Sequence, residues 1–285
     1  MDAIARRVQA ALLGILLAGS VQAGAQAPAP TPTPATAPAP APAAQAGAGD
    51  TQAVARDLLM RMARFLAQAP RFSVSMASNY DAVQSDGEKI EFGERRKVTL
   101  ERPAQLRVET ERSDGSQGGL AFTGKEILLV DLTNRVYATE PQRGGIDDSV
   151  VHLISDLGVR LPLALLLTTT LPSEFERRIR SVDYVEKTNV LGVPAHHLAA
   201  RGDKVDFQIW IEDGAQPVPL RVVITYRDEP GQPQFRAALV DWNFAPAITA
   251  ATFAPQMPAG ATRIAFATQL AAGARKTSAA KGGQR

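Results

Sequence analysis

Apolar and polar residues alternate over much of the chain between residues 72 and 244, and this period-two pattern most constrains the fold. Residues 205–226, VDFQIWIEDGAQPVPLRVVITY, contain two such runs around a segment with Gly and Pro. Because successive side chains of a strand point to opposite faces, each run predicts a strand with one buried face. The predicted hairpin places these residues on one face: Val205, Phe207, Ile209, Ile211, Leu220, Val222, Ile224 and Tyr226. Trp210 falls in the opposite phase.

The same pattern extends over residues 72–140 and 182–244, with turns at Gly, Pro and Asn residues. Residues 85–87 (SDG) predict a hairpin turn, and the glycines at 115, 118, 119 and 124 predict turns between short strands. Two helical regions interrupt the strands. Residues 50–69 have apolar side chains at helical spacing, which predicts an amphipathic helix that ends before Pro70. Residues 146–178 have helical spacing with Gly158 as a C-cap candidate, and they include LPLALLL (161–167), which predicts a helix buried on several sides.

Strands and helices do not alternate as they do in a parallel sheet, which points to an α+β fold. The layout predicts a large curved antiparallel sheet, an incomplete β-barrel, because the twist of so many strands curls a sheet. The helices are expected to cover its concave face.

The ends of the chain have a different composition. Residues 1–27 combine Arg6 and Arg7, a short apolar run and two small-residue cleavage sites, which predicts a secretory signal peptide. Residues 28–49 are a Pro/Ala-rich linker expected to be disordered, 50–267 a single folded domain, and 268–285 a basic, disordered tail. The sequence has no cysteine, hence no disulfide and no acylated cysteine. We expect a soluble periplasmic protein that is not lipidated and has no stable membrane span after signal cleavage.

The formal charge of +2 does not describe the predicted domain. Two of the 31 basic residues lie in the leader and four in the tail, whereas Asp2 is the one acidic residue of the 29 outside residues 50–267. The domain therefore has 25 basic and 28 acidic residues, a formal charge of −3. Interspersed charges with this balance provide no surface for nucleic acid, and no nucleic-acid partner is expected.

The sequence contains no recognisable catalytic pattern. His196 and His197 are adjacent in a predicted strand and should point to opposite faces, and His152 is the only other histidine. Spacings for a zinc site, a nucleophile elbow, a phosphate-binding loop or a dinucleotide fingerprint are missing. We therefore expect no cofactor, no metal and no enzymatic activity.

The distribution of large apolar residues provides the candidate site. A curved sheet under helices can close on a filled core or enclose an apolar pocket for a hydrophobic ligand, and the pattern leaves both open. If a pocket is present, the expected lining residues are Phe72, Val74, Met76, Phe92, Leu163, Leu166, Phe207, Ile209 and Ile224.

Several segments resemble a group of exported bacterial proteins of unknown function related to the LolA outer-membrane lipoprotein carrier superfamily. They are ARFLAQAPRFSV, LGVRLPLALLL, GVPAHHLAARGDKVDFQIWIEDGAQPVPLRVVITY and FAPQMPAGATRIAF, and the resemblance extends over most of residues 50–266. The resemblance implies an incomplete antiparallel barrel around helices, with an apolar interior that in LolA receives acyl chains. The expected function is that of a non-enzymatic periplasmic carrier for lipid-like or acylated ligands. The alternative is an envelope protein-interaction or stress-sensing module with a filled core.

Overall fold

The computed structural model describes residues 48–159, 161–249, 251–254 and 257–266. The expected signal peptide, the linker up to residue 47 and the basic tail lie outside the described residues, so the predicted domain boundaries stay predictions. The described elements are α2 (Ala48–Gln68), β1 (Arg71–Val83), β2 (Lys89–Glu101), β3 (Gln105–Arg112), β4 (Gln117–Phe122), β5 (Glu126–Asp131), β6 (Val136–Pro141), α3 (Ile146–Val151), a π-helix η1 (His152–Asp156), a 3₁₀-helix η2 (Ala164–Leu167), α4 (Leu171–Arg178), β7 (Ile179–Val190), β8 (Val193–Gly202), β9 (Val205–Glu212), β10 (Pro219–Tyr226), β11 (Gln234–Asn243) and β12 (Thr262–Arg263).

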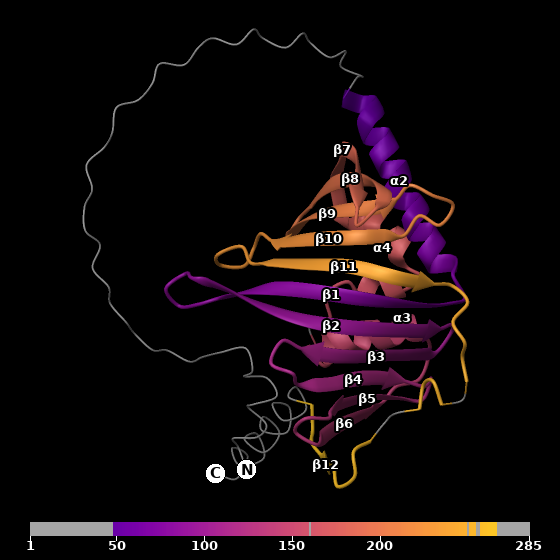
Figure 1. Ribbon diagram of the computed structural model, residues 1–285, viewed down its shortest axis with the longest axis vertical. Helices are drawn as coiled ribbons and strands as arrows, with labels where there is room; N and C mark the ends of the chain where they lie inside the picture. Colours follow the sequence, from indigo (N-terminus) through magenta and orange to yellow (C-terminus); the bar gives the residue numbers. More distant parts are fainter. Residues whose placement is uncertain (1–47, 160, 250, 255–256, 267–285) are drawn as a thin grey trace, which may run out of the picture. The chain divides into compact units, whose positions relative to one another are not determined.

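The described strands form one sheet in the order β12-β6-β5-β4-β3-β2-β1-β11-β10-β9-β8-β7 (Figure 1). Neighbouring strands are antiparallel except for β12, which pairs with β6 in parallel over two residues. The sheet is not closed, because its order ends at β12 on one side and at β7 on the other. The predicted α+β class and open antiparallel sheet are confirmed. The parallel edge strand was not predicted, because a two-residue strand leaves no periodic pattern.

Two meanders meet at the centre of the sheet. Strands β1–β6 follow one another as sequential neighbours, and β7–β11 do the same on the other side. They join where β1 pairs with β11, from Ser73 opposite Asn243 to Tyr80 opposite Phe235. The longest strand pair, β1 with β2, is closed by the predicted turn, in which Gly87 has a φ of 91° and donates to the carbonyl of Gln84.

The sheet has two unlike faces. We call the side that carries Phe72, Val74 and Met76 the core face, and the side that carries Ser73 and Ser75 the outer face. The core face packs against buried residues of α2 and of the segments that follow β6, such as Leu59, Met62, Ile146 and Leu171. Figure 1 shows α3 and α4 behind the strands, on this side of the sheet. The helices therefore cover one face, as the fold class predicts.

The hairpin of residues 205–226 has the predicted sidedness. Ile209, Ile211, Leu220 and Val222 are buried, and all four belong to the hydrophobic core. Trp210 lies in the opposite phase, stacked on His197 with ring centroids 4.0 Å apart, and the Arg221 guanidinium lies 4.9 Å from its ring centre. The indole is thus held on the outer face between an imidazole and a cation.

Two sequence interpretations are wrong. LPLALLL does not form a regular helix: only Ala164–Leu167 make a 3₁₀ turn, because Leu163 has a left-handed φ of 65° that interrupts the helix before it begins. Gly118 and Gly119 do not mark a turn, since both lie inside β4. Gly115 and Gly124 do lie outside the strands, each with a φ of 80°. Gly158, with a φ of 64°, follows the π-helix as the C-cap prediction requires.

Candidate functional site

The structure places the nine predicted ligand-contacting residues on or against the core face, in two groups. Five are buried in the core: Phe72, Val74, Met76, Leu166 and Ile209. The other four are only partly buried and pack against that core or beside it: Phe92, Leu163, Phe207 and Ile224. The first group fills space, whereas the second leaves apolar surface within reach of a ligand.

Three of the partly buried residues belong to one row that crosses the sheet. The strand register pairs Phe92 with Tyr80, Tyr80 with Phe235, Phe235 with Ile224, and Ile224 with Phe207. We call these five residues the mouth row. The Tyr80 and Phe92 rings stack with centroids 5.9 Å apart. All members except Phe235 keep part of their surface exposed.

The mouth row marks where helical cover ends. The neighbouring row on the core face contains Ile209, Val222, Ala237 and Ser78, all of them buried. One step toward the β1–β2 turn, large apolar side chains become half-exposed. Exposed apolar surface at the edge of a buried core is the geometry through which an apolar ligand can enter.

A polar pair borders the mouth row on β2. The Arg96 guanidinium forms a 2.5 Å ion pair with the Glu94 carboxylate, with side chains 14% and 8% exposed. Burial lowers the pKa of Arg96, and the carboxylate acts in the opposite direction. Burial, and then the Glu94 charge, raise the pKa of Tyr80, so its hydroxyl stays protonated at neutral pH. The row therefore has an apolar stretch and a polar end that holds hydrogen-bonding groups.

The cover over the other end of the row comes from α4 and from residues 146–159 and 161–170, which we call the helical insert. Phe175 of α4 stacks on Phe207 with ring centroids 5.9 Å apart. The Asp147 carboxylate accepts from the backbone N–H and the hydroxyl of Thr169, so the insert is closed on itself. Arg102 donates to the carbonyls of Leu66, Ala69 and Leu167, which ties the insert to the end of α2.

The helical insert is irregular for a segment that covers a core. It contains a six-residue α-helix, a π-helix and a 3₁₀ turn. Short helices with mixed hydrogen-bond patterns are less stable than one continuous helix, and π-turns often lie at functional positions. Asp147 and Arg102 make polar contacts at the ends of this cover, whereas apolar side chains such as Ile146, Leu153 and Leu166 pack into the hydrophobic core.

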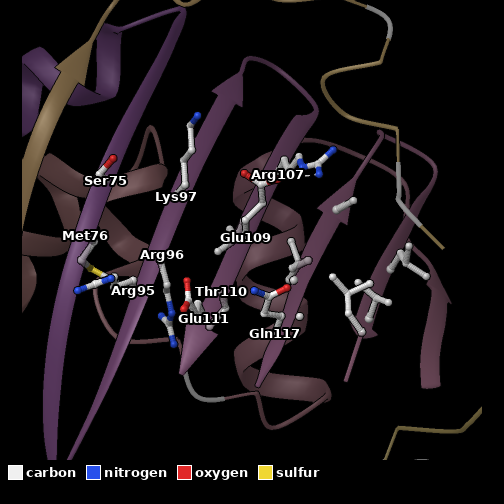
Figure 2. Close-up of a pocket in the computed structure, with 18 of the residues that line it drawn as sticks. Ser75, Met76, Arg95, Arg96, Lys97, Arg107, Glu109, Thr110, Glu111 and Gln117 are labelled. Carbon is white, nitrogen blue, oxygen red and sulfur yellow. Dashed lines mark hydrogen bonds and ion pairs between the residues drawn. The ribbon is translucent and has the colours of Figure 1, made fainter. Parts of the chain in front are cut away.

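An open pocket of about 570 Å³ lies across β1–β5 (Figure 2). It opens on the outer face, as its side chains from alternate positions such as Ser75, Lys97 and Ala121 show, and Figure 2 places the helices behind its strands. We call it the outer pocket. It is lined by Ser75, Met76, Ala77, Arg95, Arg96, Lys97, Arg107, Val108, Glu109, Thr110, Glu111, Gln117, Gly118, Gly119, Leu120, Ala121, Leu128, Val130, Leu132, Val240 and Ala254. Of the nine predicted residues, only Met76 contributes to it.

Small residues create this hollow. Gly119 stands between Glu109 and Val130 in the cross-strand row of the outer face, where other strands carry a side chain. A Cβ at Gly119 would lie 2.4 Å from the carbonyl oxygen of Val108, so any other residue there requires the backbone to shift. The sequence held a signal for this feature, because glycine inside a strand often marks a close approach. The Gly-Gly pair was instead interpreted as a turn.

The outer pocket has an apolar side and a charged side. Ala121, Leu128 and Val130 of β4 and β5 form the apolar side. On the charged side, Arg107 donates to Glu109 (2.8 Å) and to the carbonyls of Thr252 and Ala254 (both 3.2 Å). These hydrogen bonds hold residues 251–254, which we call the closing segment, against the sheet. Arg95 and Lys97 are exposed and form no ion pair with any described residue.

The neighbouring histidines of β8 have separate sets of partners. His196 contacts the Tyr184 hydroxyl (3.0 Å) and Asp213 (3.1 Å), while His197 lies on the outer face against Trp210 and Gln208. The two adjacent side chains thus point to opposite faces, as predicted. Within the described ranges, no group of three or more metal-ligating side chains is present.

The comparisons with known proteins identify a family. Residues 55–267 match the family described as "Predicted periplasmic protein (DUF2092)". The chain belongs to this family. The sequence-based resemblance to exported proteins of unknown function is therefore confirmed. No match was found among curated proteins.

Several solved structures are similar to this DUF2092 chain at low sequence identity. An uncharacterised conserved protein from Thermus thermophilus is 12% identical, with a TM-score of 0.43, over 72% of this chain and 96% of its own. A LolA superfamily protein, NE2245 from Nitrosomonas europaea, is 10% identical, with a TM-score of 0.36, over 70% and 97%. The Pseudomonas aeruginosa MucA/MucB complex contains a chain 18% identical, with a TM-score of 0.40, over 71% and 61%.

None of the described helices is long and apolar enough to cross a bilayer.

Proposed function

We propose that this DUF2092 protein is a non-enzymatic periplasmic binding protein that carries a lipid-like or acylated ligand on the core face of its sheet. The observation that carries the proposal is the mouth row, in which four aromatic and aliphatic side chains are half-exposed beside the buried Phe235. These side chains expose apolar surface to water, and a bound ligand that covers this surface gains hydrophobic free energy.

The acyl chain would lie against Phe207 and Ile224 and extend under α4 and the helical insert. Burial of each CH₂ contributes about 0.8 kcal/mol, so the affinity should rise with chain length until the space is filled. The ion pair of Glu94 and Arg96 borders the row, and together with the hydroxyl of Tyr80, a member of the row, it can bind the polar end of the ligand by hydrogen bonds. No covalent chemistry is required.

Entry of the chain requires the helical insert or α4 to move away from the sheet. The insert is suited to this because it consists of short helical turns, which are less stable than one continuous helix. Its opening breaks the hydrogen bonds of Asp147 with Thr169 and of Arg102 with Leu167, and exposes core residues such as Leu153. The nine residues predicted from the sequence remain the proposed lining of the path, with Phe207, Ile224, Phe92 and Leu163 at its accessible end. Phe72, Val74, Met76, Leu166 and Ile209 would be reached only after the insert opens.

The test is native purification from the periplasm, with bound lipid identified by mass spectrometry and a fluorescent long-chain fatty acid titrated into the delipidated protein. We expect co-purified lipid and saturable binding, with binding weakened at least tenfold in Phe207→Ser. The matched control is Gln208→Ser, the next residue of β9 on the opposite face, which should bind as the unaltered protein does. Absence of lipid together with no saturable binding would contradict the carrier proposal.

The alternative is an envelope protein-interaction or stress-sensing module whose interior is filled. The observation that favours it is an apolar pair on the helical insert, Val151 and Ile154, with 60% and 42% of their surfaces exposed. A stoichiometric protein partner, captured by crosslinking in the periplasm and lost in Val151→Ser with Ile154→Ser, would support this module. The carrier proposal predicts that the double substitution leaves lipid binding unchanged.

A further inference from the structure

The outer pocket is separate from the proposed carrier site. Outer-face side chains such as Ser75, Lys97 and Ala121 make up most of its lining, with Val240 of β11 beside them. Met76 and Arg96, whose side chains belong to the core face, also border it. The mouth row lies on the core face and extends to β9 and β10. The sheet itself stands between the two sites. A ligand of the outer pocket therefore neither needs the helical insert to move nor competes directly with a chain on the core face.

From the chemistry of its two sides, we propose that the outer pocket binds a single medium-chain amphipathic anion, with the anionic group at Arg95 and Lys97 and the chain over β4 and β5. The volume of about 570 Å³ is within the usual range for small-molecule sites. This inference stands on observations independent of the mouth row and does not require the carrier function.

The charges around the pocket favour an anion. Three basic side chains, Arg95, Lys97 and Arg107, stand on the outer face against two acidic ones, Glu109 and Glu111. Arg107 and Glu109 form an ion pair, with 2.8 Å between the guanidinium Nη2 and the carboxylate Oε1. Arg95 and Lys97 remain, opposite Glu111 and Glu109 in register, so one positive charge is in excess at the β2 rim. Two cations at alternate positions of one strand can share a carboxylate or phosphate.

The apolar side fixes the length and direction of the chain. Strands are about 4.8 Å apart, so β4 lies about 10 Å from β2 and β5 about 14 Å. Gly119 and Ala121 leave a shallow path between Lys97 and the apolar side chains Leu128 and Val130. An alkyl chain of the octyl to dodecyl class spans this distance while the anionic group of the ligand stays at the exposed rim of the pocket.

The closing segment forms one wall of the site. Ala254 lines the pocket, and its carbonyl and that of Thr252 accept hydrogen bonds from Arg107. Phe253, between them, is buried. Arg107 is thus a positioning residue: it holds the wall and neutralises Glu109, and the free cations next to it are left for the ligand.

The experiment uses the mature full-length protein with sodium decanoate as the probe and decanol as its neutral counterpart. Methyl NMR should show decanoate-dependent shifts at Leu128 and Val130, and the dissociation constant should rise at least tenfold in the double variant Arg95→Gln, Lys97→Gln. Decanol should bind more weakly and respond little to these substitutions. The matched control is Arg180→Gln, Lys204→Gln, which removes two exposed positive charges from the other half of the sheet.

Three outcomes would overturn the proposal. One is a double variant that binds decanoate as the unaltered protein does. Another is shifts confined to core-face methyls such as Ile224, which would assign the ligand to the carrier site. The third is loss of binding to phosphatidylglycerol vesicles in the double variant without any decanoate shift in the unaltered protein, which would make the β2 rim a membrane-surface patch.

Discussion

The core face and the outer face consist of the same strands but differ in what covers them. On the core face, alternate residues from Phe72 to Met76 and from Ile209 to Ile211 are buried under helices. On the outer face, the intervening residues are mostly polar, and charged side chains surround a pocket. Burial alone therefore does not identify a binding site in this protein. Each candidate site differs from the face on which it lies. The mouth row is an exposed apolar stretch on a buried face, and the outer pocket contains apolar residues on a mostly polar face.

The largest effect on the free energy of unfolding is expected for a core-face residue, Phe72, in contrast to its neighbour Ser73 on the outer face. Phe72 is fully buried and lies 5.5 Å from the Trp242 ring and 6.1 Å from the Phe244 ring. Phe72→Ala should lower the free energy of unfolding by about 3–5 kcal/mol, through lost burial and a cavity. Ser73→Ala, the next residue on the outer face, should change it by less than about 0.5 kcal/mol. Urea denaturation of both variants measures the contrast, and equal losses would mean that the faces are misassigned.

A smaller effect is expected where the outer face is hollowed. Gly119→Ala places a Cβ against the Val108 carbonyl and should cost about 1–3 kcal/mol as the strands shift. Gly93→Ala in β2 is the control, because its nearest neighbours lie 3.8 Å away. It should be neutral or stabilise slightly, since alanine reduces the freedom of the unfolded chain. Thermal unfolding of the two variants would contradict the described backbone at β4 if Gly119→Ala were the more stable.

The fold could be predicted further than the sites could. Strict alternation fixes which side of a strand is buried, so the sidedness of residues 205–226 and the outer position of Trp210 followed from the sequence. LPLALLL could not be assigned from its composition, because a left-handed Leu163 depends on the surroundings of the insert. The outer pocket depends on Gly119 and on residues that the fold brings together from β1–β5 and β11, and no local sequence pattern predicts such an arrangement.

The smallest stability effect concerns the wall of the outer pocket. Arg107→Ala removes the hydrogen bonds to the carbonyls of Thr252 and Ala254, which should cost about 0.5–1.5 kcal/mol. Hydrogen exchange should accelerate in residues 251–254 and stay unchanged in β9 and β10. Arg221→Ala is the control on the distant half of the outer face. Unchanged exchange in residues 251–254 would show that Arg107 does not hold this wall.

The proposed carrier function requires that an acyl chain bind on the core face at the mouth row. Its most direct test is the set of intermolecular NOEs between unlabelled palmitate and isotopically labelled, delipidated protein. We expect contacts from the methylenes of palmitate to the Ile224 methyl groups and the Phe207 ring, and also to Phe175 of α4. Palmitate contacts found only at Leu128 and Val130 of the outer pocket, or none at all, would contradict it.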